Sequence, residues 1–194
     1  MIANLLLHDD RTITLHGERF SVYLDSEIIQ HRVAELGARI TEDYDGKRPI
    51  LIGVLNGAFM FLSDLMKTIR IDCEVDFVKL SSYGAEKISS GVVRELKKID
   101  ADLEGRHVLV VEDIVDTGLS MEYILDIMRS QNPASVKAIT LLHKYEATEV
   151  DVVLEYVGFR IKNQFVVGYG LDYGQVGRNL PDIYVLDPEV DESQ

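Results

Sequence analysis

An acidic pair and a third acid follow an apolar run near the middle of the chain. Glu112 and Asp113 come directly after the apolar residues 108–111, and Asp116 comes before a small polar turn at 117–120 and an amphipathic stretch. A buried strand that ends in acids and turns at once into a helix N-terminus is suited to hold a phosphorylated sugar, because the first N–H groups of a helix bind anions. The acids would repel that anion unless they bind the sugar hydroxyls or Mg²⁺.

Asp116 has two interpretations that do not exclude each other. Since it lies just before the turn and the helix, it could cap the helix N-terminus, which stabilises a protein by about 1 kcal/mol. As an acid above a bound sugar, it could instead act as a general base.

Other chemistry-bearing residues follow other apolar segments. Asn56 and Gly57 follow one, Ser82 and Tyr83 follow a second, and Lys144 follows a third. In a parallel sheet the carboxyl ends of the strands share one edge, where ligands bind. We therefore expect these residues to meet the acidic pair at one edge of a sheet.

The hydrophobic pattern predicts alternating strands and helices. Helices are expected at 26–43, with Asp25 or Ser26 as the N-cap, and at 59–69 and 119–129. Strands are expected at 49–55, 74–80, 107–112, 136–142, 152–157 and 165–167, with a long mobile loop at 81–93 and a glycine-rich tail. This alternation indicates an α/β fold with a parallel sheet and helices on both faces.

Composition narrows the classes of function. The chain has 194 residues, a net charge of −13 and no cluster of lysine or arginine, which argues against binding to nucleic acid. No apolar run is long enough to suggest a membrane span, and the N-terminus lacks the features of a signal peptide. The single cysteine, Cys73, cannot form an internal disulfide, which fits a cytoplasmic protein. A phosphate-rich substrate would need Mg²⁺ to approach so acidic a protein.

The segment 110–120 closely resembles the phosphoribosyl-pyrophosphate (PRPP) signature of type I phosphoribosyltransferases. Lys144 and the segment 165–173 narrow the resemblance to the hypoxanthine-guanine phosphoribosyltransferase family, and it extends from about residue 12 to 186. The family implies a central, mostly parallel twisted sheet flanked by helices, with a small hood subdomain. It implies a single domain over 1–194, with a core at about 45–150 and a hood from about 1–24 and 151–194.

The resemblance also implies a reaction. The protein would convert hypoxanthine, and also guanine, with PRPP to the nucleoside monophosphate (IMP or GMP) and pyrophosphate, with Mg²⁺ as the cofactor. It would assemble as a homodimer or a homotetramer.

The same resemblance assigns roles around the acidic turn. Glu112 and Asp113 would bind the ribose hydroxyls and Mg²⁺, and Asp116 would handle the proton of purine N7. The 5-phosphate would be held by the residues of the turn, which are Asp116, Thr117, Gly118, Leu119 and Ser120. The family usually has Thr in place of Ser120 and often Lys in place of Leu119, and neither change removes a backbone N–H group.

The remaining roles concern the base, the pyrophosphate and a lid. The expected purine-binding residues are Lys144, which would donate to the 6-oxo group, Phe165, which would stack on the ring, Val166 and Asp172. Asp172 would also hold Mg²⁺. Pyrophosphate would contact Asn56, Gly57 and Arg178, although the family often has Lys or Arg where this chain has Asn56. Ser82 and Tyr83 would open a lid that closes over the reacting centre and excludes water.

Two other classes of protein would share parts of this sequence pattern. A regulator with the phosphoribosyltransferase fold would keep the segment 112–120 and bind PRPP or nucleotides without catalysis. A Mg²⁺-dependent phosphatase would also place acids at a strand end, but with a nucleophilic aspartate at a different spacing.

Overall fold

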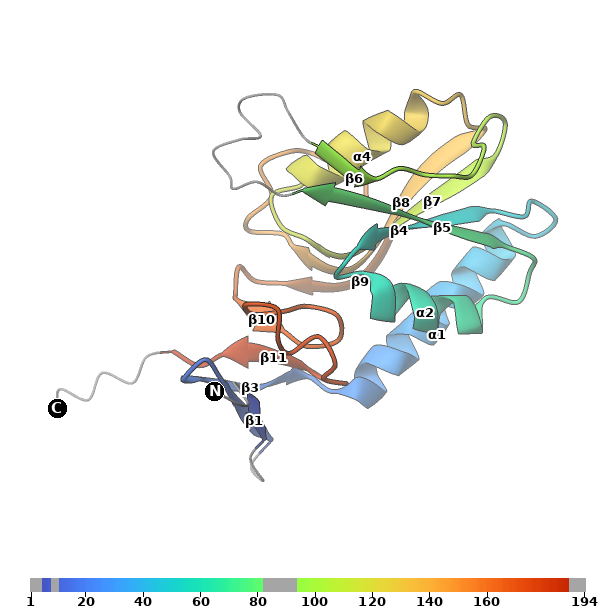
Figure 1. The fold of residues 1–194 in the computed structure, drawn as a ribbon. Helices are drawn as coiled ribbons and strands as arrows, with labels where there is room; N and C mark the ends of the chain where they lie inside the picture. The colour runs from blue at the N-terminus through green and yellow to red at the C-terminus, as the bar shows by residue number, and fades with distance from the viewer. Residues whose placement is uncertain (1–4, 8–10, 82–93, 189–194) are drawn as a thin grey trace, which may run out of the picture.

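A computed structural model describes residues 5–7, 11–81 and 94–188 of the chain, which form two sheets and the helices that cover one of them (Figure 1). The helices are α1 (Ser26–Asp43), α2 (Phe59–Thr68) and α4 (Leu119–Arg129). The strands of the central sheet are β4 (Ile50–Leu55), β5 (Glu74–Ser81), β6 (Arg94–Lys97), β7 (His107–Val115), β8 (Ser135–Lys144) and β9 (Tyr156–Ile161). The second sheet contains β1 (Leu5–Leu7), β2 (Thr12–Leu15), β3 (Glu18–Leu24), β10 (Val166–Val167) and β11 (Ile183–Leu186).

The central sheet has the strand order β6-β5-β4-β7-β8-β9. Its neighbouring strands run parallel, except that β6 pairs antiparallel with β5. Along β7, Val108 and Val110 pack into a cluster with residues of α4, whereas Leu109 and Val111 pack into a cluster with residues of α1 and α2. Both faces of the sheet are therefore buried, which explains the nearly continuous apolar runs in the sequence.

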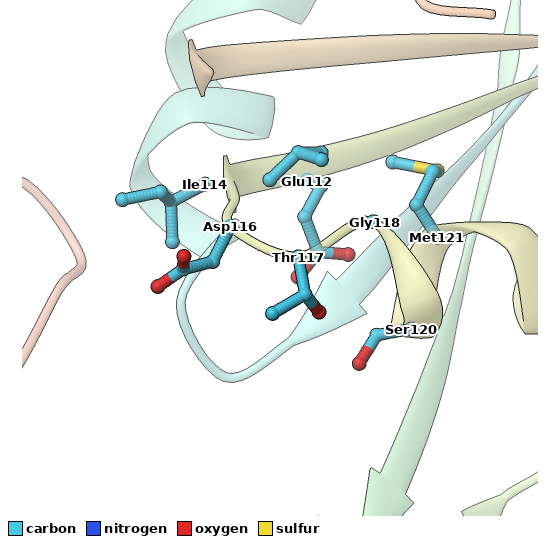
Figure 2. Close-up of a pocket in the computed structure, with 8 residues that line it drawn as sticks. Glu112, Ile114, Asp116, Thr117, Gly118, Ser120 and Met121 are labelled. Carbon is cyan, nitrogen blue, oxygen red and sulfur yellow. The ribbon is translucent and has the colours of Figure 1, made fainter. Parts of the chain in front are cut away.

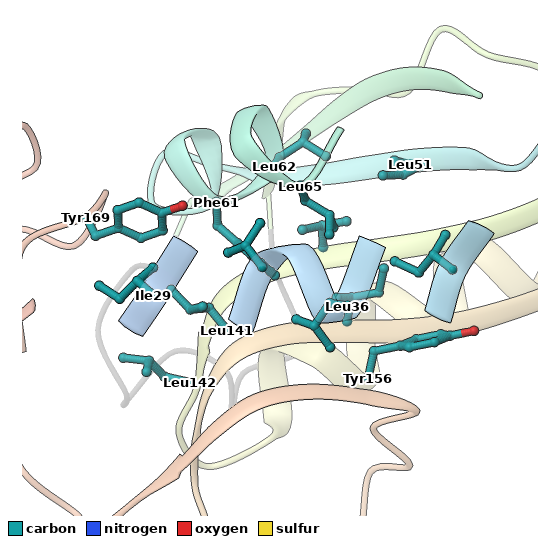
Figure 3. Close-up of a cluster of buried hydrophobic side chains, with 14 of the residues drawn as sticks. Ile29, Leu36, Leu51, Phe61, Leu62, Leu65, Leu141, Leu142, Tyr156 and Tyr169 are labelled. Atoms are coloured by element: carbon teal, nitrogen blue, oxygen red, sulfur yellow. The ribbon is translucent and has the colours of Figure 1, made fainter. Parts of the chain in front are cut away.

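Helix α1 is fixed at its start by side chains from two parts of the chain. The Asp25 carboxylate accepts hydrogen bonds from the backbone N–H groups of Glu27 and Ile28, which confirms the predicted cap. The Ser26 N–H group donates to Asp182 at 2.7 Å. Figure 3 shows the buried side of α1 packed against α2 and the central sheet. None of the helices in the described ranges is long and apolar enough to cross a membrane.

The second sheet joins the two ends of the described chain. Its strand order is β1-β2-β3-β11-β10, and every neighbouring pair is antiparallel. The blue N-terminal and red C-terminal strands lie together below the central sheet in Figure 1. This is the expected hood. The Tyr169 hydroxyl of its C-terminal part donates to Asp64 on α2 at 2.8 Å, which ties the hood to the core.

Some sequence expectations need correction. The strand expected at 152–157 is wrong, because β9 begins at Tyr156 and the Val153 side chain remains 69% exposed. The tail contains the strand β11, which was not predicted because the tail was interpreted as glycine-rich and irregular. Strand β9 lies within the expected hood segment 151–194 but pairs with β8 in the central sheet. The predicted loop at 81–93 lies outside the described residues except for Ser81, which ends β5.

Candidate active site

The carboxyl ends of the parallel strands and a loop of the hood enclose a cavity of about 380 Å³. Its volume is in the range of small-molecule sites. The strand ends and the hood supply the residues that line it, which are Gly57, Asp113, Ile114, Asp116, Lys144, Phe165, Val166, Leu171, Asp172 and Arg178. The sequence had predicted eight of these ten residues as site residues, so the expected convergence at one sheet edge is present.

A smaller hollow of about 100 Å³ lies at the N-terminus of α4 (Figure 2). Its lining residues come from the end of β7 and the following turn, and are Glu112, Ile114, Val115, Asp116, Thr117, Gly118, Ser120 and Met121. In Figure 2 the Thr117 and Ser120 side chains point to the same open side of the turn. Gly118 has a φ of 90°, a conformation that glycine adopts without strain. The first N–H groups of α4 are left without helical partners, as an anion site requires.

Leu119 does not line this hollow. It begins α4, and its N–H group lies 3.4 Å from the Thr117 hydroxyl oxygen. Any contribution of Leu119 to an anion site would come from its backbone, as the sequence analysis had assumed.

Asp116 and Lys144 form an ion pair between the two hollows. The Lys144 ammonium donates to Asp116 Oδ2 at 2.8 Å, and the two side chains are 10% and 48% exposed, respectively. Gly118 is the N-cap residue of α4, and no side chain caps that helix. The carboxylate of Asp116 is therefore not used as a cap and faces the cavity beside a buried cation.

Asp113 is buried and Glu112 is half-buried near the end of β7. Burial and then the neighbouring Asp113 carboxylate raise the pKa of Glu112 well above its usual range. Burial raises the pKa of Asp113 to about 6. The Oε2 atom of Glu112 is buried and has no hydrogen-bond partner in the described part of the chain. A buried oxygen without a partner is costly, and a bound cation or sugar hydroxyl would satisfy it.

This arrangement fits a Mg²⁺ ion that is held partly by substrate. Within the described ranges there is no group of three or more side chains that could bind a metal on its own. Mg²⁺, however, commonly takes only one or two carboxylates and completes its shell with water and phosphate oxygens. Glu112 and Asp113 can provide such carboxylates.

The hood supplies one wall of the larger cavity. Phe165 is 43% exposed, and its ring makes an edge-to-face contact with Tyr173 at a centroid distance of 5.3 Å. Val166 is buried beside it. An exposed aromatic ring whose orientation is fixed from the side can stack on a planar ligand.

Asp172 and Arg178 are joined within one hood loop. Arg178 Nη2 lies 2.5 Å from Asp172 Oδ1, and Arg178 Nη1 donates to the Gly170 carbonyl oxygen at 2.7 Å. Both side chains line the cavity. Asp172 therefore orients the guanidinium group, which suits Arg178 to bind phosphate oxygens.

Asn56 lies at a cis peptide bond with Leu55, at the end of β4. The Asn56 Oδ1 atom accepts a hydrogen bond from Lys79 Nζ at 3.1 Å. The sequence had suggested that this position lacks a cation, but Lys79 on the neighbouring strand β5 supplies one. Its position beside Asn56 follows from the parallel pairing of Leu55 with Lys79, which the sequence alone does not reveal.

Gly57 lies between the Asp113 side chain and the backbone of the hood loop at Gly170. A Cβ atom on Gly57 would lie 1.7 Å from Asp113 Oδ2, and a Cβ atom on Gly170 would lie 2.1 Å from the Gly57 carbonyl oxygen. The end of β4, the end of β7 and the hood loop are therefore packed so closely here that only glycine fits.

The expected lid residues, Ser82 and Tyr83, lie outside the described residues. A second residue that the sequence analysis missed is Thr148, whose hydroxyl group donates to the Lys144 carbonyl oxygen at 3.2 Å. No sequence motif marks it, because its role depends on the turn that follows β8.

An acidic strand end, an anion-binding turn and a hood over a parallel sheet define the class of phosphoribosyltransferases. The family model for the phosphoribosyl transferase domain matches residues 21–174, and the chain belongs to this family.

The relatives narrow the class further. The chain is 45% identical to hypoxanthine-guanine phosphoribosyltransferase of Bacillus subtilis (strain 168) over 172 residues, which cover 89% of this chain and 96% of that protein. A crystal structure of a hypoxanthine phosphoribosyltransferase from Staphylococcus aureus has a TM-score of 0.83 at 41% identity, and the match covers 87% of this chain and 91% of that one.

Some relatives are much longer than this chain, which spans about a quarter of their length. The bifunctional protein TilS/HprT of Listeria monocytogenes serotype 4b (strain F2365) is 42% identical over 91% of this chain, but the match spans only 27% of that protein.

Proposed function

We propose that the protein is a purine-salvage enzyme that transfers the phosphoribosyl group of PRPP to hypoxanthine and guanine, and releases pyrophosphate. The observation that carries this proposal is the pair of Lys144 and Asp116 at 2.8 Å in the cavity beneath the hood. It places a cationic donor and a carboxylate base side by side, as recognition of a 6-oxopurine requires.

The base is selected by Lys144 and Phe165. The Lys144 ammonium donates to the 6-oxo group, and this choice rejects adenine, because a 6-amino group cannot accept the hydrogen bond and the lysine would remain unpaired. The Phe165 ring stacks on the purine, and the backbone of Val166 reads the edge of the base. These contacts hold the purine in line with the anomeric carbon of the ribose.

Asp116 manages the proton. Its carboxylate takes the proton of purine N7 as the bond to the anomeric carbon forms, and the partner Lys144 limits the movement of both groups. The turn 117–120 binds the 5-phosphate through backbone N–H groups and the hydroxyl groups of Thr117 and Ser120.

Pyrophosphate leaves on the side of β4. Arg178 and the backbone of Asn56 and Gly57 contact it, and Lys79 adds a positive charge beside Asn56. Glu112, Asp113 and Asp172 would hold Mg²⁺ together with oxygens of the substrate. When bound, this ion supplies charge stabilisation for the departing pyrophosphate.

Two further properties belong to the proposal. We place the enzyme in the cytoplasm, because its single cysteine, Cys73, cannot form an internal disulfide. We also propose a homodimer or a homotetramer, and light scattering of the purified protein tests this. In a structural neighbour, the hypoxanthine phosphoribosyltransferase of Trypanosoma cruzi, the C-terminal region has a role in the oligomeric state.

A spectrophotometric assay with PRPP, Mg²⁺ and each free purine tests the activity. Turnover with hypoxanthine and guanine but not adenine is expected. Binding of PRPP without turnover of any purine would instead support the regulator.

The variant Lys144→Ala tests the recognition of the base. Charge-assisted hydrogen bonds contribute about 1.5–3 kcal/mol, so we expect roughly a 10- to 150-fold loss of kcat/KM for both bases. Unchanged kcat/KM for both bases would remove Lys144 from the site.

A further inference from the structure

The turn that follows Lys144 reaches from one subsite to the other. We call residues 145–150 the strap. It begins where β8 ends at Lys144, which lines the larger cavity, and it passes beside Thr117, which lines the smaller hollow. None of the strap residues lines either cavity.

Hydrogen bonds fix the strap at its Lys144 end. The Ala147 N–H group donates to the Lys144 carbonyl oxygen at 3.0 Å, and the Thr148 hydroxyl group donates to the same oxygen at 3.2 Å. The backbone of the purine-binding lysine is therefore held by two donors from the strap.

The other end of the strap is hydrogen-bonded to the turn at 117–120, the proposed 5-phosphate subsite. The N–H groups of Glu149 and Val150 both donate to the Thr117 carbonyl oxygen, at 2.9 and 3.2 Å. A Cβ atom on Gly118 would lie 3.0 Å from the Val150 carbonyl oxygen, so the strap also packs against the backbone of the turn. Consecutive residues, Thr148 and Glu149, thus contact the two subsites.

The Thr148 hydroxyl group also makes a hydrogen bond with His143, and its bond to Lys144 fixes the direction of this second bond. The single hydroxyl proton of Thr148 is used toward the Lys144 carbonyl, so the hydroxyl oxygen accepts from His143 Nε2, which lies 3.0 Å away. The His143 Nδ1 atom is buried and has no partner in the described part of the chain. Burial, and to a lesser extent the Arg160 guanidinium, lower the pKa of His143, which favours the neutral ring.

We propose that the strap couples the purine subsite to the 5-phosphate subsite, and that Thr148 is the positioning residue that transmits this coupling. The inference rests on the proposed function for the identity of the two subsites. Thr148 touches neither ligand; it fixes the position of Lys144 relative to Thr117.

The variant Thr148→Val tests the coupling, since it keeps the branched shape and removes the hydroxyl group. Neutral hydrogen bonds change equilibria by about 2- to 10-fold, so we expect the KM values for PRPP and for hypoxanthine both to rise by that factor. Lys144→Ala, by contrast, should raise the KM for hypoxanthine alone. Thr148→Ser keeps the hydroxyl group and should restore both values.

Controls separate coupling from a loss of stability. Val153→Thr adds a hydroxyl group at a position that is 69% exposed just beyond the strap, and it should leave both KM values unchanged. A Thr148 residue that only stabilised the fold would lower the melting temperature without changing KM. Thr148→Ala removes the hydroxyl group in a second way if the valine variant does not fold.

Calorimetric titration with PRPP and Mg²⁺ makes the test independent of turnover. A weaker Kd for Thr148→Val than for the wild type supports the coupling even if no purine is converted, a result that would refute the proposed function alone. An unchanged Kd and KM for PRPP in Thr148→Val would overturn the coupling. A Thr148→Ser variant as impaired as Thr148→Val would overturn it as well.

Discussion

Two carboxyl groups on the central sheet, those of Asp76 on β5 and Glu112 on β7, have opposite surroundings. Asp76 on β5 accepts hydrogen bonds from Lys97 and from the backbone N–H groups of Phe77, Asp100 and Ala101. Burial alone would raise the pKa of Asp76, but these donors outweigh it and lower the pKa to about 2.

Glu112 on β7 is the opposite case. Its Oε2 atom has no partner among the described residues, and burial raises its pKa. A buried acid with a full set of donors holds the protein together, here by fixing the turn after β6. A buried carboxyl oxygen without a donor, such as Glu112 Oε2, costs stability, which indicates that it is reserved for a ligand. Variants at the end of β7 should therefore affect activity, and variants around Asp76 should affect stability.

The largest expected effect is the loss of Asp116, the proposed general base at the carboxyl end of the sheet. In Asp116→Asn, kcat should fall by about 10²- to 10⁴-fold, because the amide cannot take the purine proton. Asp116 is 48% exposed and does not cap α4, so the melting temperature and the binding of PRPP should change little. Stopped-flow rates and thermal melts measure both. A near-normal kcat would mean that the proton is handled elsewhere.

The next variant tests directly whether Glu112 is reserved for a ligand. Glu112→Gln should weaken the Kd for PRPP with Mg²⁺ by roughly 10- to 150-fold, because a charged acceptor is lost. The melting temperature of the ligand-free protein should stay the same or rise, because Glu112 Oε2 has no hydrogen-bond partner to lose and the raised pKa of this carboxyl group favours its neutral form. Glu104→Gln, at an exposed position, is the control. A large drop in melting temperature would show that Glu112 is structural and would break the comparison.

The converse variant is Asp76→Asn. A folded pKa of about 2 against an ordinary value of 3.8 corresponds to about 2 kcal/mol of stability at neutral pH. The melting temperature should fall by about 4–8 °C with kcat unchanged, whereas the exposed control Asp45→Asn should have no effect.

The same carboxylate gives a dependence on pH. Because its pKa is lower in the folded protein, its stabilisation is complete above about pH 4 and is lost as the pH falls toward 2. Urea unfolding of the wild type and of Asp76→Asn should therefore converge in that range. A constant difference between the two proteins at every pH would show that Asp76 acts through packing rather than through its charge.

The smallest expected effect concerns Lys79. This partly exposed residue lies on β5, as Asp76 does, but at the level of Leu55 near the candidate active site. Lys79→Met should raise the inhibition constant of pyrophosphate by roughly 1.5- to 5-fold, since partly exposed charges contribute little. Lys98→Met removes the same charge from an exposed position and should not change it. Equal effects of both variants would indicate a general influence of net charge.

The sequence was sufficient to predict the helices, because hydrophobic periodicity and capping residues are local patterns. Helix α1 has the predicted bounds, with Asp25 as its cap, and α4 begins and ends as expected. The expectation for 152–157 was wrong because the apolar residues there do not decide where pairing begins. β9 starts at Tyr156, which pairs with Ile139 of β8.

The site could be predicted as far as a single motif or strand end reveals it. Asp113, Lys144 and Phe165 line one cavity, as expected. Lys79 and Thr148 could not be found, because the first depends on the register of β4 with β5 and the second on the conformation of the strap. Both act through atoms that are distant in the sequence, and no residue pattern records such pairings.

At Gly57 and Gly170 the sheet edge and the hood loop approach each other so closely that neither position has room for a Cβ atom. In a library of variants selected for a new base preference, positions 57 and 170 should return only glycine. Altered preferences would have to arise on the cavity walls, at side chains such as Phe165 and Lys144. Under the proposed function, base preference can therefore change more readily than the distance between the hood and the sheet.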